Sequence, residues 1–221
     1  MNFPDSLLDP AWYWTALTVW AALLVHCLWR APWRRLQDSE SLNVWLGMIV
    51  LLTLIWSMQA GVKPGLTLHL LGATVFTLCF GPALAYVGLS LVALGVALNG
   101  DAGWLAYPLN ALLLGGGGVL FSQGLYRLFV ALLPRHFFVY IFINGFLGSA
   151  LTVVGIGLLA NLLLGVSGAY AWDYLVEEYL PYFVLLAFAE AWLSGMVMTL
   201  FVVYRPHWVV TFDDRQYLAG K

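Results

Sequence analysis

Two ionisable side chains stand inside long apolar stretches of this sequence, and both are of types that do chemistry in proteins. Glu190 is the carboxylate of the segment Phe-Ala-Glu-Ala-Trp, and His69 is the imidazole of the segment Leu-Thr-Leu-His-Leu-Leu-Gly. Ionisable groups in hydrocarbon are costly and are usually paired or functional. The favoured interpretation of Glu190 is a hydrogen-bonded residue that joins helices, because such bonds are common between membrane helices. The alternative is a carboxylate that binds a cation or controls a gate.

His69 is the only histidine that we expect on the outer side of the membrane. Histidine is the commonest metal ligand, although a lone histidine is more often a hydrogen-bonded core residue. The sequence has no HxH, HxxxH, CxxC or DxD spacing, so it predicts no metal cluster formed by neighbouring residues. Asn110 and Tyr107 fall on the same side as His69. This shared side predicts an outward-facing polar pocket.

Catalytic patterns are missing from the sequence. There is no GxxxxGK[ST] phosphate loop, and no Ser-His-Asp, Cys-His or paired-carboxylate arrangement recurs at one depth. The sequence therefore predicts no catalytic residues, no bound nucleotide and no enzyme activity.

Composition defines the class of protein that must position these side chains. The chain has 221 residues, of which 62% are apolar and 9% are charged. Soluble domains have about half apolar and about a quarter charged residues. Such a composition excludes a soluble enzyme, a nucleic-acid-binding protein and a disordered protein. It predicts a single integral membrane domain over residues 1–221, with lipid as a partner and no nucleic acid.

Hydrophobic windows separated by charges and turn residues predict an all-α bundle of about seven transmembrane helices. We expect them at residues 11–29, 43–62, 66–81, 83–99, 104–126, 137–165 and 179–203. The third and fourth meet at Gly81-Pro82, and an alternative merges them into one re-entrant unit. Glycines of the sixth are expected to bend or split it.

Basic residues predict the orientation of these segments. Lys and Arg are enriched in cytoplasmic loops. With the N-terminus outside and the C-terminus in the cytoplasm, only Lys63 falls outside. The eight basic residues that then fall inside are Arg30, Arg34, Arg35, Arg127, Arg135, Arg205, Arg215 and Lys221. Residues 204–221 are then a cytoplasmic tail.

The first ten residues do not resemble a cleavable signal peptide, because they carry Asp5 and Asp9 and no basic residue. We therefore expect Met1 to remain, with its free amine at the outer face. Cys27 and Cys79 fall near the inner ends of their segments, where reduced thiols are expected rather than a disulfide.

Two stretches resemble the membrane substrate-binding subunits of cobalt and nickel energy-coupling-factor transporters. Residues 1–6 read Met-Asn-Phe-Pro-Asp-Ser, where that family starts Met-His-Ile-Pro-Asp-Gly. Residues 68–72 read Leu-His-Leu-Leu-Gly, which is similar to the family's Gly-His-Leu-Leu-Gly, and a Gly-Pro turn follows at residue 81. Further matches follow in order along nearly the whole chain: Asn99-Gly100-Asp101-Ala102-Gly103, Leu109-Asn110, Leu125-Tyr126-Arg127, Ala189-Glu190-Ala191 and Tyr204-Arg205-Pro206.

The resemblance implies a metal site made of nitrogen atoms. In that family the N-terminal segment folds into the bundle, and the terminal amine, the second residue's backbone nitrogen and two imidazoles form a nearly planar set. Here Met1 supplies the amine and His69 one imidazole, but Asn2 replaces the other. Nitrogen-rich tetragonal sites suit Ni(II), Cu(II) or Co(II).

The resemblance implies a transition-metal uptake subunit of the bacterial cytoplasmic (inner) membrane. Its implied partners are a transmembrane coupling subunit and cytoplasmic ATPases, and the metal is its substrate. Two alternatives stay open. One is a non-transporting interaction or metalloenzyme-assembly protein that has lost or altered the metal site at Asn2. The other is a solitary transporter, or a carrier of a different small solute.

Overall fold

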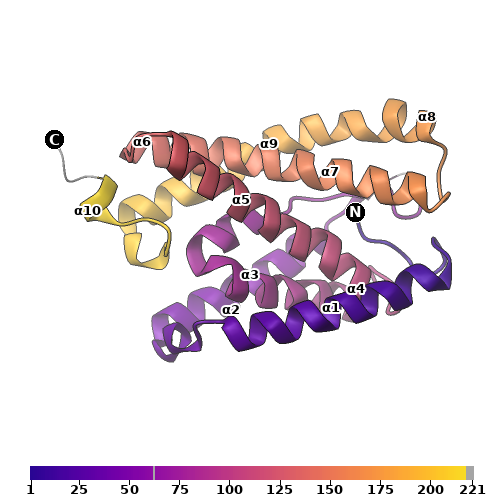
Figure 1. Ribbon diagram of the computed structural model, residues 1–221, viewed down its shortest axis with the longest axis horizontal. Helices are drawn as coiled ribbons and strands as arrows, with labels where there is room; N and C mark the ends of the chain where they lie inside the picture. Colours follow the sequence, from indigo (N-terminus) through magenta and orange to yellow (C-terminus); the bar gives the residue numbers. More distant parts are fainter. Residues whose placement is uncertain (62, 218–221) are drawn as a thin grey trace.

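Helices dominate the computed structural model, which describes residues 1–61 and 63–217 (Figure 1). Five helical segments of this part are long and apolar enough to cross a membrane. They are α1 (Pro10–Arg30), α2 (Ser39–Ser57), α3 (Ala73–Leu98), a stretch that joins α6 (Phe137–Val139), η3 (Tyr140–Leu147) and α7 (Gly148–Val166), and a stretch that joins α8 (Trp172–Tyr174), η4 (Leu175–Tyr179) and α9 (Leu180–Tyr204).

The remaining elements are one more long helical stretch and several short pieces. A further continuous helical stretch joins α4 (Tyr107–Asn110), η2 (Ala111–Gly116) and α5 (Gly117–Leu132). The small elements are η1 (Trp33–Gln37), β1 (Ala60–Gly61), β2 (Thr67–Leu68), η5 (Pro206–Trp208) and α10 (Asp214–Tyr217).

Helix α3 is a hairpin of two arms, as the Gly81-Pro82 pair predicts. Gly81 has φ 77° and ψ 167°, which no helix contains. A side chain at Gly88 would meet the ring of Phe76, so residues on either side of the break lie against each other. Trp45 of α2 contacts both arms, because its indole nitrogen donates to the Leu84 carbonyl at 3.2 Å and its ring lies 6.5 Å from that of Phe76. With the two arms counted separately and residues 107–132 added, the described chain has seven long helical segments or arms, of which the first α3 arm is too short to cross a membrane by itself.

The first arm is shorter than the expected helix of residues 66–81. Its helical part begins at Ala73, and Thr67–Leu68 form strand β2, which pairs antiparallel with β1. Gly72 precedes the helix with φ 65°, a left-handed conformation that glycine adopts without a steric penalty. His69 therefore lies on an extended segment, not one turn inside a helix.

The sixth segment is neither broken nor split by its glycines. Residues 137–166 form one continuous helical stretch, with η3 as a π-helical section from Tyr140 to Leu147. The seventh segment begins at Trp172 rather than at residue 179, and it also contains a π-helical section, η4. Single π turns inside α-helices often occur near functional sites.

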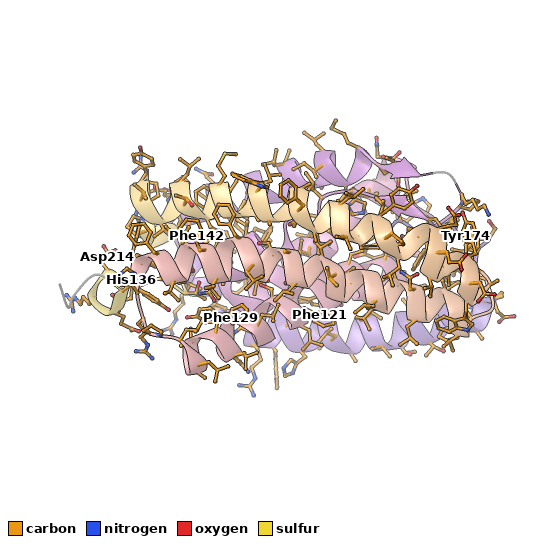
Figure 2. All side chains as sticks on the ribbon, turned by 90° about the horizontal axis from the view of Figure 1, so that it is seen from above. Phe121, Phe129, His136, Phe142, Tyr174 and Asp214 are labelled. Carbon is orange, nitrogen blue, oxygen red and sulfur yellow. The ribbon has the colours of Figure 1, made fainter. Side chains whose placement is uncertain are left out.

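The C-terminal segment packs on the end of the bundle opposite β1 and β2. The backbone N–H groups of Val210 and Thr211 donate to the carbonyls of Cys79 and Leu78 beside the Gly81 turn. Arg35 donates to the carbonyls of His207 and Trp208. Figure 2 shows His136 and Asp214 at this end and Tyr174 at the other.

Basic residues gather at the end of the bundle where the C-terminal segment packs. Arg30 ends α1, and Arg34 and Arg35 lie within η1. Lys221 and the last residue of the expected second segment, Val62, lie outside the described residues. The two cysteines are free and buried, as expected for reduced thiols.

Candidate metal-binding site

The start of the chain lies inside the bundle, where Figure 1 marks the N-terminus between helices. Met1 and Phe3 are fully buried, and Asn2 is 5% exposed. The Met1 amine donates to both the carbonyl and the hydroxyl oxygen of Thr67. The backbone N–H of Asn2 donates to the same hydroxyl at 3.0 Å. Thr67 therefore holds two consecutive nitrogens of the N-terminus.

Asn110 fixes the next residue by a two-pronged contact. The backbone N–H of Phe3 donates to Asn110 Oδ1 at 2.9 Å, and Asn110 Nδ2 donates to the Phe3 carbonyl at 3.2 Å. Asp5 then accepts a hydrogen bond from the backbone N–H of Ala106 at 2.8 Å, at the start of α4. Gly103 faces Asp5 so closely that a side chain there would overlap its carboxylate. These contacts set how far the N-terminal segment enters the bundle.

His69 presents one free ring nitrogen. It is 3% exposed, and its ring centroid lies 5.1 Å from that of Trp56. Its Nδ1 lies 3.1 Å from the Leu70 carbonyl, which only accepts, so Nδ1 carries the proton. Nε2 is buried and has no hydrogen-bond partner among the described residues. A histidine that ligates a metal has this arrangement, with one nitrogen donating to a carbonyl and the other free.

Glu190 and Trp56 hold the backbone around His69. The Glu190 carboxylate accepts hydrogen bonds from the backbone N–H groups of Leu71 and Gly72, both at 2.7 Å, and from the Ser194 hydroxyl at 3.0 Å. Trp56 Nε1 donates to the Leu71 carbonyl at 3.0 Å. Because α3 begins at Ala73, the carboxylate also lies at a helix N-terminus, where negative charge is stabilised. Its oxygens are engaged by donors, so the geometry favours joining of segments over cation binding.

Burial also changes the chemistry of the Met1 amine. Loss of solvation lowers its pKa well below the ordinary value of 8.0. A neutral amine has a free electron pair for a metal ion, whereas a protonated amine has none. Among the described residues, no group of three or more His, Cys, Asp and Glu side chains is placed to hold a metal.

The side chain of Asn2 is directed at the end of α2. Its Nδ2 lies 3.3 Å from the Trp56 carbonyl and 3.3 Å from Gln59 Oε1. Trp56 thus links Asn2, through its carbonyl, to His69, through its ring.

The predicted polar residues divide into two groups. Met1, Asn2, His69, Asn110 and Glu190 belong to one hydrogen-bonded region around residues 67–72. Tyr107 does not, because its hydroxyl donates to the Ser90 carbonyl at 3.3 Å and so joins α4 to α3.

The sequence does not indicate that Thr67, Trp56 and Gln59 belong to this site. Thr67 lies two residues before His69, and this proximity is its only signal. Nothing in the sequence indicates that Trp56 and Gln59 face the chain's start.

Known proteins resemble this chain in sequence and in fold. The sequence matches the family described as "cobalt uptake substrate-specific transmembrane region" (CbiM) over residues 2–208. No curated protein matches it. The crystal structure of a truncated transition metal transporter superposes with a TM-score of 0.73 at 19% identity, covering 92% of this chain and 99% of that one. A second transition metal transporter gives a TM-score of 0.68 at 20% identity, covering 90% of this chain and 91% of the other.

The two structural matches establish a shared fold, and the family match covers nearly every described segment. An integral membrane protein with a buried N-terminus and a free imidazole nitrogen is consistent with both. The chain belongs to the family of cobalt uptake substrate-specific transmembrane regions and is a transport component, not an enzyme.

Proposed function

We propose that this chain captures a divalent transition metal through the Met1 amine, the Asn2 backbone nitrogen and Nε2 of His69. The observation that carries the proposal is the buried, unpartnered Nε2 of His69 in the same region as a buried terminal amine. Nitrogen donors of this kind suit cobalt, nickel and copper ions rather than magnesium or calcium. The metal is cargo that must enter and leave.

Thr67 supports a reversible site. Its two oxygens accept the hydrogen bonds of the nitrogens that would bind the metal. A metal ion would replace these bonds, and the Asn2 backbone nitrogen would release its proton to solvent as it binds. Metal release with return of that proton would restore the bonds to Thr67, so the two nitrogens have partners in both states.

Asn2 determines the strength of capture. Its neutral amide replaces an imidazole, and its Nδ2 faces two oxygen atoms on α2. Amide nitrogens do not ligate these ions as imidazole does, so one side-chain donor is missing. We propose that the site binds metal with three nitrogens from this chain and leaves a position for water.

Transport requires other components, as the description of a substrate-specific region implies. We propose a transmembrane coupling subunit and cytoplasmic ATPases as these partners. We also propose the bacterial cytoplasmic membrane as the location, with the N-terminus and His69 facing outward and the arginine-rich end facing the cytoplasm.

Cobalt accumulation in cells tests this function. Cells that express the chain with its coupling components are expected to accumulate cobalt, and His69→Ala is expected to abolish the gain. His136→Ala is the matched control, since His136 precedes α6 and is not among the predicted ligands. Accumulation that is unchanged by His69→Ala contradicts the proposal. The wild type could also fail to accumulate cobalt in cells while the purified protein binds no metal. That result would favour the non-transporting alternative.

A further inference from the structure

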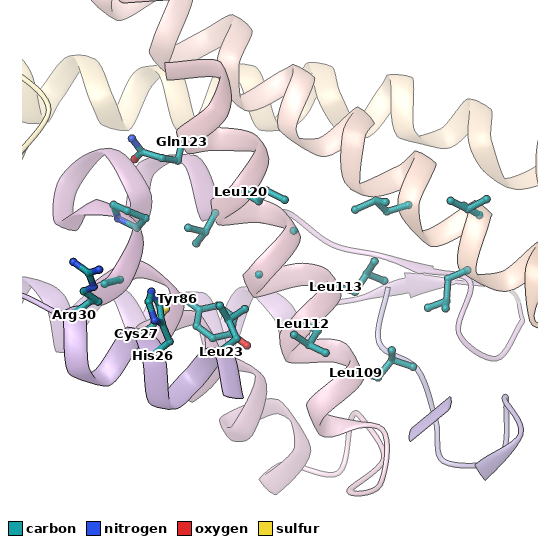
Figure 3. A pocket seen from close by; sticks show the side chains of 18 of the residues that line it. Leu23, His26, Cys27, Arg30, Tyr86, Leu109, Leu112, Leu113, Leu120 and Gln123 are labelled. Atoms are coloured by element: carbon teal, nitrogen blue, oxygen red, sulfur yellow. The ribbon is translucent and has the colours of Figure 1, made fainter. Parts of the chain in front are cut away.

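A long apolar groove lies apart from the metal site, between α1, the second arm of α3, residues 107–132 and α7 (Figure 3). Its volume is about 960 Å³. Along α1 its lining extends from Trp12 to Arg30, and along the facing stretch from Leu109 to Arg127. Each run spans 19 residues from end to end, and a helical rise of 1.5 Å per residue places its two end residues roughly 27 Å apart. The groove therefore has nearly the depth of the hydrocarbon core, about 30 Å.

The groove opens toward lipid. Leu120 and Leu162 line it and are 72% and 52% exposed on the outer surface of the bundle. Gly116 forms part of its wall without a side chain, and a Cβ there would come within 3.3 Å of Tyr86 and 3.7 Å of Leu23. The middle of the groove is thus a surface of leucine side chains and bare backbone.

Polar side chains gather at one end of the groove. Arg30 and His26 come from α1, and Arg127 and Gln123 come from α5. Figure 3 shows His26, Arg30 and Gln123 at the end away from Leu109. Among the described residues, the ion pairs all involve Glu40 with Arg205 or His207, and no acidic residue lines the groove. Two guanidinium groups therefore line one apolar groove, with no acidic side chain beside them in the part of the chain that the structure describes.

We propose that the groove binds an anionic phospholipid, with the phosphate between Arg30 and Arg127 and the acyl chains along the wall from Leu120 to Leu109. Guanidinium groups bind phosphate oxygens through paired hydrogen bonds. Basic sites between membrane helices are known to hold anionic headgroups. His26 and Gln123 add two side chains that donate hydrogen bonds to the same headgroup.

The charges of the groove favour a phospholipid over a helix from a protein partner. A helix would bring backbone and side chains toward two arginines, and it would need acidic residues to pair with them.

Native mass spectrometry of protein released from phosphatidylcholine vesicles with a minor share of phosphatidylglycerol tests the proposal. The wild type is expected to retain phosphatidylglycerol in preference to phosphatidylcholine. The double variant Arg30→Gln/Arg127→Gln is expected to lose this retention about tenfold or more. The matched control Arg34→Gln/Arg135→Gln removes the same charge from residues outside the groove and is expected to retain lipid. Equal retention of both lipids, or unchanged retention in the Arg30/Arg127 variant, overturns the proposal.

A second experiment tests the acyl-chain wall without altering charge. A photo-crosslinking amino acid at position 120, introduced in cell membranes, is expected to form adducts with lipid. Protein adducts alone would overturn the proposal and identify the groove as a partner-helix site. Gly116→Leu, with all arginines kept, is expected to reduce retention of phosphatidylglycerol. Full retention in a folded Gly116→Leu protein would contradict the placement of the acyl chains.

Discussion

Asn2 is the residue at which this chain departs from the donor set that its resemblance implies. The amide makes hydrogen bonds to Trp56 and Gln59, which hold the side chain toward α2. An imidazole at the same position has a ring nitrogen that can bind a metal instead. The identity of one side chain therefore decides whether the site has one imidazole or two.

Substitution of Asn2 by His is expected to raise the affinity for Ni²⁺ or Co²⁺ by roughly 10-fold or more, because an imidazole replaces water at the open position. Titration calorimetry of the purified protein with a native N-terminus measures this change. Asn2→Gln serves as the control, since it keeps a neutral amide and is expected to give no gain. An unaltered affinity in the Asn2→His protein would mean that the site has been remodelled.

For single residues, the sequence indicates which atoms could bind a metal, but not which residues hold those atoms in position. Met1, Asn2 and His69 are identifiable because their types and the resemblance point to nitrogen ligation. Thr67 is not, because a threonine in an apolar segment carries no signal of its own. Its role depends on contacts with Met1 and Asn2, which lie 66 and 65 positions earlier in the chain.

Among the elements, the segment between α2 and α3 does most to place His69. It is extended rather than helical because its backbone donors have partners outside any helix. Leu71 and Gly72 donate to Glu190, which is 119 and 118 residues away. Apolar composition alone predicts a helix there, and a partner so distant in sequence cannot be predicted from a hydropathy window.

Replacement of Glu190 by Gln is expected to destabilise the protein by about 1–3 kcal/mol, since an amide offers one acceptor where two backbone N–H groups need acceptors. Metal affinity should fall as well, because the segment that carries His69 loosens. Thermal denaturation and metal titration measure the two effects. Stability and affinity that match those of the wild type would reduce Glu190 to ordinary packing.

The break in α3 is predictable from Gly81-Pro82, and a substitution at Gly81 tests whether the hairpin depends on glycine. Gly81 has φ 77° and ψ 167°, a region that only glycine enters readily. Gly81→Ala is expected to cost about 1–3 kcal/mol of stability through backbone strain, although a Cβ there would meet only Val210 at 3.9 Å.

Gly124→Ala is the control for this experiment. Gly124 lies in α5, and a Cβ there would meet nothing within 4 Å. This substitution is expected to leave stability unchanged or to raise it by about 0.5–1 kcal/mol. Equal midpoints of thermal denaturation for the two variants would contradict the account of the α3 hairpin.

For the whole molecule, the polar ends of the bundle predict how it lies in the membrane. One end carries β1, β2 and Lys63, and the other carries Arg30, the two arginines of η1 and the contacts of Arg35 with the C-terminal segment. Composition and charge suffice to predict a membrane bundle with these two ends. The packing of the chain's start into the bundle is added by the structure.

Labelling with a membrane-impermeant thiol reagent tests the proposed orientation. A cysteine introduced at Lys63 is expected to react in intact cells, whereas one at Arg34 is expected to react only after permeabilisation. Cys27 and Cys79 are buried and provide a low background. The opposite pattern would place the metal site on the cytoplasmic side and would contradict capture from outside.

Metal content of the purified protein tests the central claim most directly, because the claim rests on a free terminal amine beside His69. We predict about one Co²⁺ or Ni²⁺ per chain for the protein with a native N-terminus. Addition of one glycine before Met1, or His69→Ala, is expected to abolish stoichiometric binding, while His136→Ala keeps it. Unchanged metal content after both the glycine extension and His69→Ala would contradict the account.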